Sequence, residues 1–80
     1  MKLSSREIRL LRLSRDLKQE SMGKLMGISK QRYSQLENNP NIKIERVNEI
    51  LKTLEYTPDT AKTYLAAIPT HSIMRQLNDK

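Results

Sequence analysis

Between residues 30 and 38, amide and hydroxyl side chains recur at the spacing of one helix face. They are Gln31, Ser34, Gln35 and Asn38. At about 100° per residue these four share one side of a helix, and Tyr33, Leu36 and Glu37 lie on the other. A carboxamide donates and accepts at once, so it matches N6 and N7 of adenine. Because a solvated helix face more often mixes Lys with Glu, the pattern favours contact with DNA base edges.

Two short helices joined by a tight turn are predicted around this segment. Ser29 is a favourable N-cap for the helix that carries the amides, and Gly27 can take the left-handed conformation that ends the helix before it. That earlier helix is expected over residues 19–26. Its predicted buried residues are Met22, Leu25 and Met26. Gly23 would let the next helix cross closely, which accounts for a glycine inside a helix.

A pattern that resembles the helix-turn-helix of the phage-repressor (Cro/cI) family runs through this segment. It consists of Gln19, Gly23, Gly27, Ile28, Tyr33, Leu36, Glu37 and Asn38. The resemblance extends over about residues 8–56 and implies a lambda-repressor-like DNA-binding domain. Three positions depart from it: Lys18 replaces a capping Ser or Thr, Tyr33 replaces Ile or Val, and Asn39 replaces Gly. The ENNP run, residues 37–40, also resembles HipB-type antitoxins.

The resemblance implies that the N-terminal part of the second helix enters the major groove. The residues expected at base edges are Lys30, Gln31, Arg32, Ser34 and Gln35. Phosphate contacts are implied for Gln19 and Asn38, and an ion pair is implied between Arg12 and Glu37. Glu37 falls on the core side of its helix, where a charge needs a partner. The alternative is that Arg12 and Glu37 are unrelated surface charges.

The remaining helices are predicted from caps and from apolar spacing. Ser4 and Glu7 have the spacing of a capping box and Leu3 and Ile8 that of a hydrophobic staple, which opens a first helix over about residues 5–15. Ile8, Leu11 and Leu17 are its expected core contacts, whereas Arg6, Arg9 and Arg15 are expected outside. The overall prediction is an all-α compact bundle of about five helices.

The second half of the chain supplies the last two of these helices. After a turn at Pro40, a buried stripe is expected from Ile44, Val47, Ile50, Leu51 and Leu54. Thr57 and Pro58 begin a fifth helix. Residues 1–69 are the predicted DNA-binding domain, and residues 70–80 a tail. Ile73, Met74 and Leu77 give that tail helical spacing, so it could dock or fray.

Composition narrows the classes of partner. The chain has 80 residues, a formal charge of +6 and a pI near 9.9, which favours a nucleic acid over a membrane, the alternative being a merely soluble basic protein. So small a core favours a homodimer. Cysteine is absent, so disulfides and thiolate metal sites are excluded, and a cytoplasmic location is expected. No apolar run approaches the roughly 20 residues of a membrane span.

Catalysis is not indicated, because the sequence has no recognisable nucleophile, acid–base pair, metal cluster or phosphate loop. The single histidine, His71, lies in the tail, and no cofactor is expected. The favoured function is a sequence-specific regulator of transcription that binds double-stranded DNA, acting as a homodimeric repressor on a palindromic operator. The alternative is an antitoxin that binds a cognate toxin protein and autoregulates its operon. RNA binding is less favoured, since no sheet with exposed aromatics is predicted.

Overall fold

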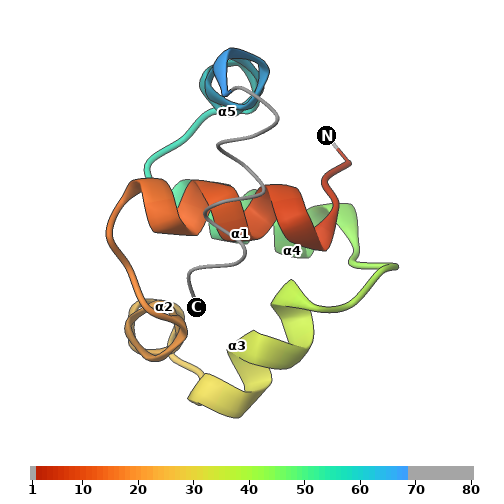
Figure 1. Cartoon of the computed structure of the whole chain (residues 1–80). Coiled ribbons are helices and arrows are strands. Elements are labelled where there is room, and N and C mark those ends of the chain that lie inside the picture. The colour runs from red at the N-terminus through yellow and green to blue at the C-terminus, as the bar shows by residue number, and fades with distance from the viewer. Residues whose placement is uncertain (1, 69–80) are drawn as a thin grey trace.

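The computed structural model describes residues 2–68, and within them it contains five helices. They are α1 (Ser5–Ser14), α2 (Gln19–Met26), α3 (Lys30–Glu37), α4 (Ile44–Thr53) and α5 (Pro58–Ala67). In Figure 1, α1 crosses the middle of the view with α4 behind it, α5 lies above, and α2 and α3 lie below. The prediction of an all-α bundle of about five helices is confirmed. The predicted tail, residues 70–80, lies outside the described residues.

The helix starts follow from side chains that satisfy free backbone groups. The Ser4 hydroxyl accepts from the Glu7 backbone N–H at 3.2 Å, and the Glu7 carboxylate accepts from the Ser4 N–H at 2.9 Å. The capping box predicted at this position is therefore present. Thr57 caps α5 in the same reciprocal way with Thr60, directly before Pro58 in the first turn.

Helices α2 and α3 are joined by a turn that only a few residue types can form. Gly27 has φ 73°, in the left-handed region, and ends α2. Ser29 then caps α3 by accepting from the Arg32 N–H. A Cβ atom on Gly23 would lie 2.8 Å from the backbone oxygen of Ile28 and 3.1 Å from that of Ser29. Gly23 thus admits the backbone of the turn itself, which brings the start of α3 against α2.

The core lies where all five helices meet. Its buried apolar members are Leu3, Ile8, Leu11, Met22, Tyr33, Ile42, Val47, Ile50, Leu51, Leu54 and Ala61. Two predicted members were wrong. Leu25 is 60% exposed, because it precedes the half-buried Met26 by one residue and so points about 100° away from it. Ile44 is 51% exposed, and Ile42, in the loop before α4, is buried at that end instead.

Candidate nucleic-acid interface

A buried carboxylate fixes α3 to the two helices before it. Glu37, in the last turn of α3, has no exposed surface. Arg12 of α1 donates two hydrogen bonds to the Glu37 carboxylate, from Nε to Oε2 at 2.8 Å and from Nη2 to Oε1 at 3.2 Å. Arg12 Nη1 also donates to the Leu17 carbonyl at 2.7 Å, which ties in the α1–α2 loop. The ion pair implied by the family resemblance is thus present, with planar two-point geometry.

The electrostatics of this pair are those of a charged carboxylate that is fully partnered. Burial by itself would raise the pKa of Glu37, but hydrogen bonds and charge from Arg12, with help from Gln19, outweigh it and hold that pKa below its ordinary value. Burial, and next the nearby charge of Glu37, raises the pKa of Tyr33 far above that of a free tyrosine. Glu37 is therefore ionised and Tyr33 neutral at physiological pH.

Gln19 opens α2 and is drawn into the same cluster. Its Nε2 donates to Glu37 Oε1 at 3.1 Å, and the side chain is half-buried. Gln19 is predicted from the family resemblance to contact a phosphate, and its bond to Glu37 was not predicted. The bond holds the start of α2 against the end of α3, and it uses only one of the two N–H donors on Gln19 Nε2.

The prediction that the Arg9 side chain stays in solvent is wrong. This side chain is only 24% exposed, with Nε 3.5 Å from Glu37 Oε1. Its Nη2 donates to Asn38 Oδ1 at 3.0 Å. A signal was present in the sequence: Arg9 precedes Arg12 by three residues, so both lie on the same face of a helix. Arg15, predicted to be outside, is exposed, and its guanidinium stacks on the Tyr56 ring 4.2 Å from the centroid.

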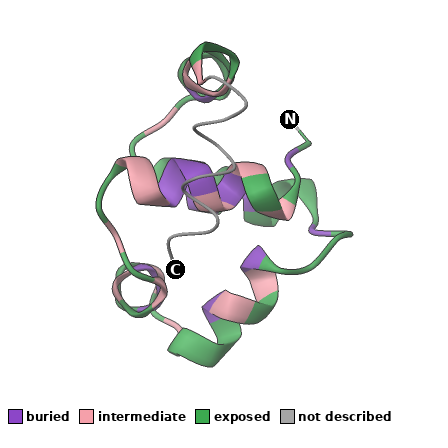
Figure 2. Cartoon of the chain, in the orientation of Figure 1, coloured by how far each residue is buried: buried purple, intermediate pink, exposed green. Residues whose placement is uncertain are grey.

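The opposite side of α3 is open to solvent. Lys30, Gln31, Arg32 and Gln35 are exposed, whereas Ser34 is half-buried. Figure 2 shows the first turn of α3 as exposed, while buried residues lie toward its other end. Asn38 is exposed at the C-terminal cap, with its amide bonded to neighbouring groups. The five residues predicted at base edges thus come from one short helix. The inner side of this helix is anchored by Glu37 and its partners Arg9, Arg12 and Gln19, which together are called the Glu37 cluster.

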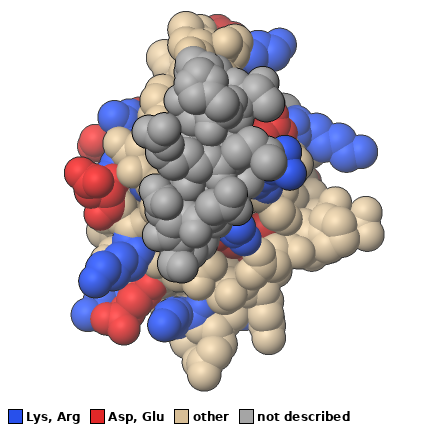
Figure 3. Space-filling model, viewed as in Figure 1, with Lys and Arg blue, Asp and Glu red and all other residues tan. Residues whose placement is uncertain are grey.

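A surface hollow of about 700 Å³ lies beside this helix. Lys18, Gln19 and Lys30 line it together with Arg12, Leu13 and the acidic Glu20, so the starts of α2 and α3 meet there and basic groups outnumber the one carboxylate. Lys18 caps α2 without a side-chain hydrogen bond, which leaves the N–H groups of the first turn of α2 free to meet an anion. On the face shown in Figure 3, the surface over α3 is mostly uncharged and basic and acidic groups mix beside it. This arrangement suits a backbone phosphate at the hollow and base edges along α3.

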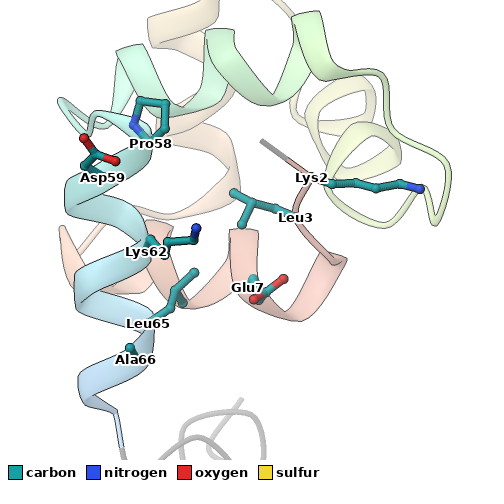
Figure 4. A pocket seen from close by; sticks show the side chains of 8 residues that line it. All are labelled: Lys2, Leu3, Glu7, Pro58, Asp59, Lys62, Leu65 and Ala66. Carbon is teal, nitrogen blue, oxygen red and sulfur yellow. The ribbon is translucent and has the colours of Figure 1, made fainter.

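A second groove, of about 590 Å³, lies between the chain start and α5. Figure 4 shows Leu3 and Leu65 among its lining residues, with charged groups of both signs around them. Within residues 2–68 no group of three or more His, Cys, Asp or Glu side chains is placed to hold a metal ion. None of the helices described there is long and apolar enough to cross a membrane.

Comparison with known protein families identifies the family to which the chain belongs. A family model described as a helix-turn-helix (HTH_3) matches residues 8–60, which is more than half of the chain. The chain belongs to this family. No curated protein and no solved structure matches it. This helix-turn-helix family is that of Cro/cI-type, lambda-repressor-like domains, so the chain contains a DNA-binding domain in which α2 and α3 form the motif.

Two departures from the usual helix-turn-helix pattern have a structural explanation. Tyr33 is completely buried, so its ring fills the position of a smaller aliphatic residue, although its hydroxyl has no hydrogen-bond partner in the described part of the chain. Asn39 lies outside the left-handed region, so no glycine is needed there. Its Oδ1 accepts from the Asn41 N–H at 2.9 Å and forms a tight turn before α4.

Proposed function

We propose that this helix-turn-helix protein is a sequence-specific regulator of transcription that represses by occupying an operator. The observation that carries the proposal is the contrast around α3. Gln31 and Gln35 are exposed one turn apart on the outer side, whereas Glu37 is locked to Arg12 on the inner side. Because the helix backbone is anchored in this way, binding to base edges has to order only the amide side chains and not the helix.

In the proposed complex the N-terminal part of α3 lies in the major groove and α2 lies across the backbone. Gln31 and Gln35 contact base edges, flanked by Lys30, Arg32 and Ser34. The second N–H of Gln19 Nε2, together with Lys18, meets a phosphate at the hollow between the starts of α2 and α3. Phosphate contacts set the register and the base contacts set the sequence preference.

We further propose that two copies bind together. A homodimer would place its two α3 helices about 34 Å apart, one helical turn of DNA, and its operator would be palindromic. Occupancy of such a site within a promoter blocks transcription without any further activity.

Selection of bound duplexes from a random library tests the proposal. The expected result is an enriched motif of two inverted half-sites, about 10 base pairs from centre to centre. Affinity for that motif should fall steeply with salt, with a slope in log K of about 0.9 per neutralised phosphate. A library recovered without any enriched motif would refute sequence-specific binding. A single enriched half-site bound by one copy would refute the dimer but would still support sequence-specific binding.

A further inference from the structure

A chain of hydrogen bonds runs from α1 to the outer side of α3. Arg9 Nη2 donates to Asn38 Oδ1 at 3.0 Å. Asn38 Nδ2 in turn donates to the Ser34 carbonyl oxygen at 3.0 Å and to Ser34 Oγ at 3.3 Å. Both functional atoms of the Asn38 amide are therefore bonded within the protein, although the residue lies at the surface.

The order of these bonds determines which way the Asn38 amide faces. A guanidinium has only donors, so the atom opposite Arg9 must be the amide oxygen. The Ser34 carbonyl has only lone pairs, so the atom opposite it must be the amide nitrogen. Rotating the amide by 180° would oppose donor to donor at Arg9 and acceptor to acceptor at Ser34.

This orientation decides the role of the Ser34 hydroxyl. The hydroxyl has one hydrogen and two lone pairs, and one lone pair accepts from Asn38. Among residues 2–68 no protein group accepts the hydroxyl hydrogen. A serine in a helix often donates to the carbonyl four residues earlier, but Ser34 makes no such bond. Its hydrogen is thus available to a ligand.

We propose that Arg9 and Asn38 are positioning residues that set Ser34 as a hydrogen-bond donor toward DNA. This inference rests on the proposed function, in which the outer side of α3 lies in the major groove. A donor there favours a base that presents an acceptor, such as O6 and N7 of guanine or O4 of thymine. It disfavours cytosine, whose N4 amino group is itself a donor. The role thus assigned to Asn38 is to orient Ser34 rather than to hold a phosphate.

The substitution Asn38→Asp tests this orientation with almost no change in shape. The aspartate can still accept from Arg9, but its second oxygen loses the bond to the Ser34 carbonyl oxygen, which is also an acceptor, and can be satisfied on this side only by the Ser34 hydroxyl hydrogen. The Ser34 hydrogen then turns inward and its lone pairs face the DNA. At one base position the ratio of cytosine to guanine preference should rise by about fivefold or more, since a good contact of this kind contributes at least about 1 kcal/mol.

The matched control is the same substitution in a Ser34→Ala background. The added negative charge weakens binding to every duplex equally in both backgrounds, so it cancels. The change in base preference should appear only where the Ser34 hydroxyl is present. A preference that shifts equally in both backgrounds, or in neither, would overturn the inference.

The outcome is distinguishable from failure of the proposed function. If the unsubstituted protein selects no motif, the specific reader fails and this inference fails with it. If it selects a motif but the two backgrounds respond alike, only the role of Arg9 and Asn38 fails. Should Asn38→Asp not fold, as judged by thermal melting, Ser34→Ala alone decides. That variant should lose its discrimination against cytosine at one position, and an unchanged profile would overturn the inference.

Discussion

The inner and outer sides of α3 both carry polar side chains, but the inner ones bond within the protein and the outer ones are open to a ligand. On the inner side, Glu37 is fully buried and receives hydrogen bonds from Arg12 and Gln19. On the outer side, Gln31 and Gln35 are exposed. A buried charge needs hydrogen-bonding and ionic partners within the protein, whereas an exposed amide can exchange its hydrogen bonds with water for bonds to a ligand. Inner substitutions should therefore act on stability, and outer ones on the choice of DNA sequence.

The largest effect is expected from removing the partner of the buried carboxylate. Arg12→Ala removes the main partner of Glu37 and leaves it only the Gln19 amide and the longer contact with Arg9, which should lower the free energy of unfolding by about 3 kcal/mol, the lower end of the range for a broken buried pair. The control is Arg6→Ala, also in α1, whose exposed side chain should contribute little. Chemical denaturation of both variants measures the difference. Equal midpoints would mean that the inner cluster does not hold α3.

Acid should weaken the inner side by titrating the same carboxylate. Because its pKa is lowered on folding, Glu37 contributes its full stability above the pKa of an unfolded glutamate. That contribution is lost as the pH falls through the lower, folded pKa. Melting temperatures measured across this range should therefore drop more in the unsubstituted protein than in Glu37→Gln, which cannot titrate. Parallel acid profiles for the two proteins would contradict this assignment.

The smallest effect, and one of opposite sign, is expected from Tyr33→Phe. The Tyr33 hydroxyl is buried without a hydrogen-bond partner of good geometry in the described residues, and its weaker interaction with the nearby Glu37 carboxylate only partly offsets the free energy that burying it costs. Its removal should raise the free energy of unfolding by up to about 1 kcal/mol. Tyr64→Phe, at a half-buried ring in α5, is the control and should change little. A clear loss of stability in Tyr33→Phe would show that the hydroxyl has a partner.

Local sequence signals predicted the helices and their boundaries well. Capping residues such as Ser4, Ser29 and Thr57 act on their own first turn, so their effect is readable from spacing alone. The errors arose where a side chain depends on a distant element. Leu25 is apolar but points away from the core, and Arg9 is charged but reaches Glu37, 28 residues later along the chain. The apolar spacing within one short helix does not specify which neighbouring helix packs against each part of its surface.

The bond from Gln19 to Glu37 could not be read from the sequence for the same reason. It depends on how closely the start of α2 approaches the end of α3, which the turn around Gly27 sets in three dimensions. Exposure of Gln31 and Gln35 was predictable, because both lie opposite Tyr33 and Glu37 on the same helix. The roles of these amides in DNA binding remain predictions.

The most direct test of the division between the two sides compares Gln35→Ala with Gln19→Ala. Base-preference profiles over a site library, measured together with melting temperatures, provide both readouts. Gln35→Ala should lose about 1–3 kcal/mol at one preferred base and relax the preference there, with its melting temperature unchanged. Gln19→Ala should weaken binding to all sequences alike and melt slightly earlier, because its bond to Glu37 is lost. If Gln35→Ala weakens all sequences uniformly while Gln19→Ala alters base preference, α3 is not the helix in the groove.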